Sequence, residues 1–368
     1  MGGNRVIRGP RRWVLLTAVL VLAPAGLVAC ASASSGTPAS SGASAASSGV
    51  PASPSAKASP SAKASPTPSP SGPFSSFPAY LPDPASRMLL GTYISLSGKS
   101  TEAAIEQREA AMGHRYNLQL TYYNWDDQFP DSGEATIAAH GRTPVVTWYG
   151  PGKDADDPRT VAEVIDGSDD GWIRQQAQAI KDFGHRIYLR LMPEMNGTWY
   201  HGFSGNPQEY VAAWQRIHRL FAQESVTNVT WVWCPNIDPD DWDQYYPGNS
   251  YVDIIGVDGF SNTKYGYQTF EQMFGSFLQH YAGRKPLMIV ETATNSGNGD
   301  AAEDIGSAAS FISGMDSYVR NVAGPRYGLV AVCWFDTDNT DNFDWRLDQT
   351  PAAWQAWLSL ARDPYFGG

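Results

Sequence analysis

The sequence predicts a single (β/α)8 barrel that follows an export signal and a long tether. Short apolar runs alternate with helix-like stretches eight times between residues 88 and 361. The expected domain has about 290 residues, which lies within the usual size range of such a barrel. The rival fold, a doubly wound open sheet, lacks its expected Gly-x-Gly-x-x-Gly turn after the first strand.

Residues 1–29 have the pattern of a lipoprotein signal peptide. A basic head containing Arg5 and Arg12 precedes an apolar stretch from Trp13 to Leu22, and the segment leads into Leu27-Val-Ala-Cys30. This ending resembles a bacterial lipobox, in which the cysteine is acylated and becomes the first mature residue. The apolar stretch is too short to remain as a membrane-spanning helix. We therefore expect a lipid anchor at Cys30 that holds the protein on the extracellular face of a bacterial cell membrane.

Composition separates a tether from the domain. Residues 30–77 are mostly Ala, Ser and Pro, which predicts a disordered tether, and residues 78–368 form the expected barrel domain. Without the signal peptide, 22 of the 26 basic residues face 37 acidic ones. This balance argues against nucleic acid as a partner. We expect a monomer without a cofactor, with Cys234 and Cys333 as buried free thiols rather than a disulfide.

Each strand is predicted from an apolar run of the length typical of strands covered on both faces. The expected strands are residues 88–94, 118–125, 144–148, 188–192, 229–234, 252–257, 287–290 and 329–335.

Helices are predicted from capping residues and helical spacing. The first opens at Ser100 and closes at Gly113, and the helix after the fourth strand carries an apolar face that includes Trp214 and Phe221. The expected helices are residues 101–112, 132–140, 170–183, 206–224, 270–281, 301–322 and 352–361.

Two glutamates stand at the carboxyl ends of predicted strands. Pro193 stops the fourth strand directly before Glu194, and the seventh strand runs into Glu291. In a barrel these ends surround one mouth. Two carboxyls there are what a retaining glycosidase needs, one to protonate the leaving oxygen and one to attack the anomeric carbon.

Polar and aromatic residues near the same strand ends are candidates for sugar binding, because sugars need apolar faces to stack on and polar groups to fix hydroxyls. These candidates are Trp148, Asn196, Trp199, His201, Trp233, Asp258 and Trp334.

The motif Arg190-Leu-Met-Pro-Glu-Met-Asn-Gly-Thr-Trp-Tyr200 resembles the acid/base motif of glycoside hydrolase family 26, the family of β-mannanases and some β-1,3-xylanases and mixed-linkage glucanases. The segments 246–260 and 290–292 resemble its sixth strand and its nucleophile strand. The resemblance implies a barrel with Glu194 as acid/base and Glu291 as nucleophile. It also implies that Arg190 orients the nucleophile and that Trp199 and Trp334 line sugar subsites.

Two positions depart from the family pattern. The family usually has histidine before the acid/base, where this chain has Pro193. It usually has tyrosine at the end of the sixth strand, where this chain has Phe260, which cannot hydrogen-bond Glu291. Losing such a bond costs about 1.5–3 kcal/mol, so we expect weak activity on plain β-mannan and better activity on another β-linked polysaccharide.

Three functions are therefore compared. The favoured one is a surface-anchored retaining endo-glycosidase acting on β-linked polysaccharide, with β-1,4-mannan first and β-1,3-xylan, mixed-linkage glucan or a bacterial exopolysaccharide as alternatives. The second is a catalytically silent carbohydrate-binding lipoprotein, which would have no reason to retain both Glu194 and Glu291. The third, a solute-binding lipoprotein of a transporter, predicts two lobes rather than eight strand-and-helix units. No metal site is predicted, because the six histidines lack a strong ligand spacing.

Overall fold

The computed structural model describes residues 74, 77–262, 266–295, 307–338 and 343–367. The predicted signal peptide, Cys30 and nearly all of the predicted tether lie outside these residues. No helix in the described ranges is long and apolar enough to cross a membrane.

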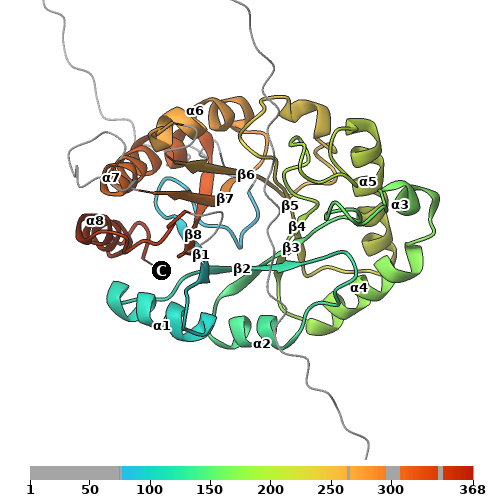
Figure 1. Cartoon of the computed structure of the whole chain (residues 1–368), viewed down its shortest axis with the longest axis horizontal. Coiled ribbons are helices and arrows are strands. Elements are labelled where there is room, and N and C mark those ends of the chain that lie inside the picture. The colour runs from blue at the N-terminus through green and yellow to red at the C-terminus, as the bar shows by residue number, and fades with distance from the viewer. Residues whose placement is uncertain (1–73, 75–76, 263–265, 296–306, 339–342, 368) are drawn as a thin grey trace, which may run out of the picture. The chain divides into compact units, whose positions relative to one another are not determined.

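The described chain forms a closed barrel of eight parallel strands surrounded by helices (Figure 1). Strand β1 pairs with both β2 and β8, which closes the ring. The predicted (β/α)8 fold is confirmed. The strands are β1 Leu89–Ser95, β2 Leu118–Tyr123, β3 Thr143–Trp148, β4 Ile187–Leu191, β5 Val229–Trp233, β6 Ile254–Ser261, β7 Leu287–Thr294 and β8 Leu329–Thr337.

Most helix boundaries follow the capping signals. Ser100 caps α1 and Thr269 caps α6, each by accepting a backbone N–H with its hydroxyl. The helices are α1 Thr101–Met112, α2 Ser132–Ala139, α3 Ala162–Asp166, α4 Asp170–Phe183, α5 Pro207–Gln223, α6 Phe270–Tyr281, α7 Ala308–Tyr318 and α8 Pro351–Ala361, with a 3-10 turn η1 Trp242–Tyr245 and a π-helical segment η2 Val319–Tyr327.

Some elements differ from the prediction. β6 and β7 each run four residues further than expected, and β8 runs two residues further, because polar residues continue the ladder at the mouth. The short helix α3 was not predicted. The last part of the helix expected at 301–322 is the wider segment η2, and residues 301–306 lie outside the described chain.

Two apolar layers position the strands. One cluster fills the inside of the barrel and includes Leu120, Met288 and Val290, whereas a larger cluster lies between the strands and the helices. Side chains alternate between these layers along each strand. Cys234 and Cys333 belong to the inner layer and are free and buried, as expected.

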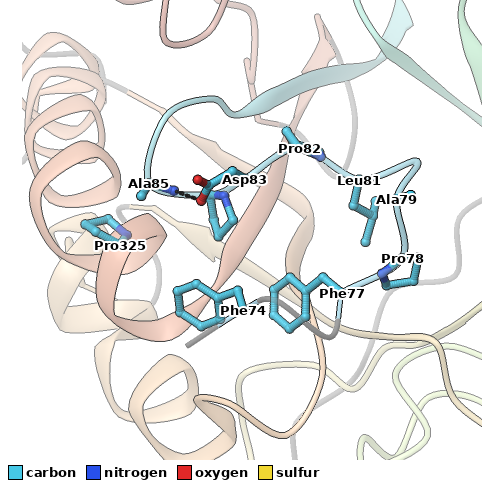
Figure 2. Close-up of a pocket in the computed structure, with 10 residues that line it drawn as sticks. Phe74, Phe77, Pro78, Ala79, Leu81, Pro82, Asp83, Ala85 and Pro325 are labelled. Carbon is cyan, nitrogen blue, oxygen red and sulfur yellow. Dashed lines mark hydrogen bonds between the residues drawn. The ribbon is translucent and has the colours of Figure 1, made fainter. Parts of the chain in front are cut away.

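The segment before β1 closes the amino end of the barrel. Leu81 is 8% exposed and joins the inner apolar cluster. The Arg186 guanidinium lies 3.9 Å from the centroid of the Tyr80 ring. Phe74 and Phe77 lie side by side at the edge of a pocket that this segment lines (Figure 2). Because this packing extends to Phe74, we propose that the folded domain begins a few residues before residue 78.

Candidate active site

Glu194 lies on a strained turn directly after β4. Met192 has φ 42° and Glu194 has φ 54°, which are left-handed conformations that cost non-glycine residues of order 1–3 kcal/mol each. The Glu194 amide donates to the carbonyl of Cys234 at 2.8 Å. This bond ties the turn to the end of β5 and fixes the Glu194 carboxyl at the mouth.

Two side chains hold the Glu194 carboxyl. Asn236 Nδ2 donates to Oε1 at 2.8 Å, and Trp199 Nε1 donates to Oε2 at 3.0 Å. Burial raises the pKa of Glu194 and the negative charge of Glu291 raises it further, while Arg190 and the two donors act in the opposite direction. The net direction is upward, which is what a carboxyl needs if it is to hold a proton for a leaving group.

Glu291 lies in β7, next to Asp258 of β6 in the strand ladder, and is 8% exposed. Two donors reach its Oε1: Arg190 Nη1 and the hydroxyl of Tyr122, the latter at 2.7 Å. The carboxylate is therefore held by a cation from β4 and a neutral donor from β2.

Arg190 is buried between two carboxylates. Its Nη2 donates to Asp258 Oδ2, and its Nη1 also donates to Thr147 Oγ1 at 3.2 Å. Burial raises the pKa of Asp258 well above its usual range, and Arg190 acts against this rise. Asp258 is 0% exposed in this structure, and the expectation that it binds substrate stays a prediction. Asp258 fixes the guanidinium that contacts Glu291.

Comparison with known proteins agrees with this arrangement. The family description "Glycosyl hydrolase family 26" matches residues 147–323, a range that contains Arg190, Glu194 and Glu291. Endoglucanase H of Acetivibrio thermocellus is 29% identical over 275 residues, which are 70% of this chain and 29% of that protein. A mannan endo-1,4-beta-mannosidase of Bacillus subtilis is 30% identical over 128 residues, 32% of this chain and 33% of the relative.

This chain resembles glycoside hydrolase family 26 over residues 147–323. It spans about a third of the length of these two relatives. Among solved structures, a Cellulomonas fimi endo-beta-1,4-mannanase double mutant superposes with a TM-score of 0.58, at 16% identity, over 77% of this chain and 72% of that one. At this identity the likeness concerns the fold.

Three of the expected sugar-binding tryptophans face away from the mouth. Trp148 stacks on Trp125 at 4.5 Å between ring centroids, Trp233 packs edge-on against α6, and Trp334 packs against α8. Each is at most 1% exposed. These rings fill the layer between strands and helices in this structure, and the expectation that Trp148, Trp233 and Trp334 bind sugar stays a prediction.

Aromatic residues of the opposite strand face line the mouth instead. Tyr149 follows Trp148 and stacks on Tyr122 at 6.3 Å. Phe335 follows Trp334 and stacks on Tyr93 at 5.0 Å. Tyrosine and phenylalanine side chains of the strands thus line this part of the mouth.

The loop after Glu194 contains the other three candidates. Trp199 is 36% exposed while contacting Glu194, so it remains a candidate for stacking on sugar. Asn196 is 4% exposed and donates to the carbonyls of Asn236 and Pro239, so it holds the loop, and the expectation that it binds sugar stays a prediction. His201 is exposed, and within the described residues it makes no hydrogen bond to either glutamate.

Tyr122 is the main residue that reasoning from the sequence missed. The neighbouring Tyr123 lies on the other face of β2, where its hydroxyl donates at 2.6 Å to Glu134 of α2, on the outside of the barrel. Tyr122 lies on the inner face and supplies Glu291 with a hydroxyl that Phe260 cannot. Glu291 therefore has a hydroxyl donor even though Phe260 offers none.

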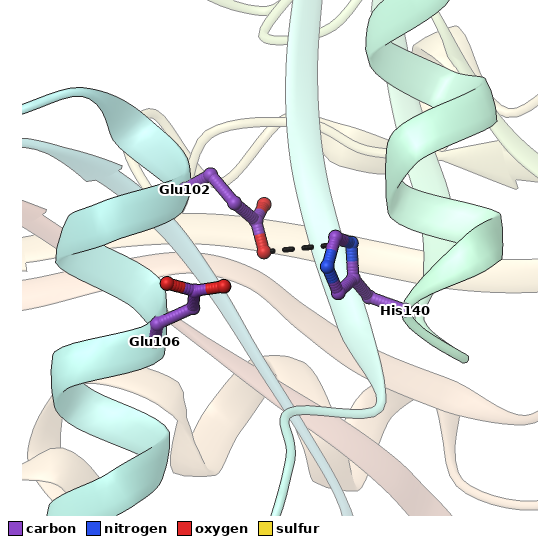
Figure 3. A group of neighbouring side chains, drawn as sticks. All are labelled: Glu102, Glu106 and His140. Atoms are coloured by element: carbon purple, nitrogen blue, oxygen red, sulfur yellow. Dashed lines mark ion pairs between the residues drawn. The ribbon is translucent and has the colours of Figure 1, made fainter.

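The described residues contain one group with the composition of a metal site, away from the mouth: Glu102, Glu106 and His140 (Figure 3). Both oxygens of Glu102 accept hydrogen bonds from Arg142. His140 Nδ1 bonds the carbonyl of Thr136 at 2.9 Å. Because an arginine already neutralises Glu102, this group does not favour a cation.

Proposed function

We propose that this protein is a retaining endo-glycosidase that hydrolyses a β-linked polysaccharide. The observation that carries the proposal is the contrast between the two glutamates at one mouth. Burial and a negative neighbour raise the pKa of Glu194, which suits it to donate a proton, whereas Glu291 accepts hydrogen bonds from the Arg190 guanidinium and the Tyr122 hydroxyl, as a positioned nucleophile would.

In the proposed reaction, Glu291 attacks the anomeric carbon while Glu194 protonates the departing oxygen. Glu194, now a carboxylate, then takes a proton from water, which attacks the anomeric carbon and releases Glu291. Two inversions at one carbon give net retention. Following the first-formed anomer by NMR tests this step, and an inverted product would exclude a covalent intermediate.

The substrate class is proposed from the site and the relatives together. We rank β-1,4-mannan and mixed-linkage β-glucan first, since the relatives are named mannan endo-1,4-beta-mannosidase and endoglucanase. Phe260 offers Glu291 no hydroxyl, but the Tyr122 hydroxyl offsets that loss, so Phe260 no longer predicts weak activity on mannan. Pro193 still replaces a polar side chain beside Glu194, so β-1,3-xylan and bacterial exopolysaccharides stay in the panel.

The protein's location is proposed from the lipobox alone. We propose that acylated Cys30 anchors it to the extracellular face of the membrane, where a polysaccharide substrate is accessible.

The decisive experiment measures reducing ends released from the four polysaccharide classes by the parent protein, Glu291→Ala, Glu194→Ala and Glu209→Ala. Glu209 is an exposed glutamate on α5 and serves as the matched control. We expect no turnover by Glu291→Ala and a loss of about 10²–10⁴-fold for Glu194→Ala on polysaccharide. With an aryl glycoside carrying a good leaving group, Glu194→Ala should still form the glycosyl-enzyme, and azide should release it as a glycosyl azide.

Two results would contradict the proposal. Near-normal polysaccharide hydrolysis by either glutamate variant would remove the pair from the mechanism. Binding of polysaccharide by the parent protein without any release of reducing ends would favour the catalytically silent lipoprotein.

A further inference from the structure

The position of Tyr122 opposite Glu291 is more specific than packing requires. Tyr122 belongs to β2 and Glu291 to β7, two strands that do not neighbour each other in the barrel. The Tyr122 hydroxyl crosses the barrel interior and meets Glu291 Oε1 at 2.7 Å. A distance of this length is typical of a hydroxyl that donates to a carboxylate.

The chemistry of Tyr122 makes it a permanent donor. Burial raises the pKa of the Tyr122 phenol well above its usual value, and the charge of Glu291 raises it further, so the hydroxyl keeps its proton at neutral pH. The carboxylate of Glu291 is the acceptor.

The Tyr122 ring is held from two sides. Tyr93 of β1 meets it edge-on at 4.8 Å between centroids, and Tyr149 stacks on it at 6.3 Å. A tyrosine has only two side-chain torsions that place its ring, and here Tyr93 of β1 and Tyr149, which directly follows β3, restrict both. The hydroxyl is therefore aimed before substrate arrives.

The two donors to Glu291 converge on one oxygen. Arg190 Nη1 and Tyr122 Oη both donate to Oε1. Among the described residues, none is seen to donate a hydrogen bond to Oε2. A carboxylate bound in this way keeps one oxygen engaged by the protein, and Oε2 is the oxygen left for attack. Phe260, at the end of the neighbouring strand β6, packs on Phe335 and Trp345 and offers no donor.

We propose that Tyr122 is the positioning residue that orients Glu291 for attack, a task that Phe260 cannot perform at the end of β6. The inference rests on the proposed function, because it concerns how Glu291 acts as nucleophile. Tyr122 acts through Glu291 and is not assigned a contact with the sugar.

The test compares Tyr122→Phe with Tyr123→Phe. Tyr123 is the next residue of β2, and its hydroxyl also donates to a carboxylate, Glu134 Oε2, but on the outer face. Both variants lose one hydroxyl and keep the ring. We expect Tyr122→Phe to lower kcat/KM by about 10- to 150-fold, which is what loss of a hydrogen bond to a charged group predicts. The Kd of a non-hydrolysable oligosaccharide analogue should stay nearly unchanged. Tyr123→Phe should keep kcat/KM within about twofold.

A covalent probe separates misorientation from misfolding. An activated 2-deoxy-2-fluoro glycoside of the best hydrolysed sugar should label Glu291 once per molecule in parent and Tyr122→Phe proteins, as read by intact mass. The labelling rate should fall by the same factor as kcat/KM, whereas the final stoichiometry should not. A lower stoichiometry with an unchanged rate would mean that the ring merely supports the fold, and would overturn the inference.

Rescue from another strand gives a second readout. In the double variant Tyr122→Phe/Phe260→Tyr, a hydroxyl at the end of β6 is available to Glu291, and we expect part of the lost kcat/KM to return. A parent protein that hydrolyses polysaccharide while Tyr122→Phe matches its kcat/KM would overturn this inference alone. A parent protein that hydrolyses nothing and is not labelled would overturn the proposed function and this inference together.

Discussion

Trp199→Phe should change the pH dependence of the reaction without removing an aromatic ring from the mouth. In the parent protein, Trp199 Nε1 donates to Glu194 Oε2 at 3.0 Å, and this bond lowers the pKa of Glu194 against the larger effects of burial and of Glu291. Phenylalanine keeps a ring of similar position but has no N–H. The charged form of Glu194 loses a stabilising donor, so the pKa of Glu194 should rise.

The magnitude follows from the exposure of the donor. A hydrogen bond to a charged group contributes about 1.5–3 kcal/mol when water cannot replace it. Trp199 is 36% exposed, so water replaces part of the loss, and about 1 kcal/mol remains. At about 1.4 kcal/mol per pH unit, the alkaline limb of the profile should move upward by roughly half to one unit.

The assay is kcat/KM on a soluble oligosaccharide between about pH 4 and pH 10. The alkaline limb reports deprotonation of the general acid in the free enzyme. Trp172→Phe is the matched control, because Trp172 is partly exposed on α4 and donates its Nε1 to the carbonyl of Trp125, at 2.8 Å. An alkaline limb that stays in place, or that moves to lower pH, would refute the assignment of Glu194 as the acid held by Trp199.

Two further predictions concern residues that precede the first strand. Leu81→Ala should lower the free energy of unfolding, measured by chemical denaturation, by about 2–5 kcal/mol, because it opens a cavity at the amino end of the barrel. The kcat/KM of this variant at 25 °C should not change, since the site lies at the opposite end of the barrel. A large loss of kcat/KM with unchanged stability would contradict this separation. Cys30→Ser should move the protein from the membrane fraction to the soluble fraction of cells, and unchanged membrane association would show that the lipobox assignment is wrong.

The fold could be predicted largely because local signals mark its helices. Thr101–Met112, Asp170–Phe183 and Phe270–Tyr281 were predicted to the residue, since a cap, a glycine or a helical apolar face marks each of them. The strand ends were harder to place. Asp258 and Glu291 continue their strands at the mouth, and polar residues there look like loop in the sequence.

The site could be predicted only in part. The two glutamates and Arg190 stand beside one another in the structure because strand ends meet at one mouth, which follows from the fold. The direction of each tryptophan did not follow. Parallel strands are buried on both faces, so Trp148 and Trp334 sit in runs that are apolar throughout, and no alternation reveals which face looks inward. The contact of Tyr122 with Glu291 joins residues 169 positions apart and carries no local signal.

Both ends of the described chain meet on the side of the barrel away from the glutamates. The Tyr365 hydroxyl donates to the carbonyl of Pro84 at 2.7 Å, and the Met88 amide donates to the carbonyl of Tyr365 at 2.7 Å. A short linker could therefore join the two ends, and new ends could be opened in a surface loop. The same geometry suits insertion of the whole domain into a host protein, or its immobilisation on a resin through either end, with the mouth left open to a bulky polymer.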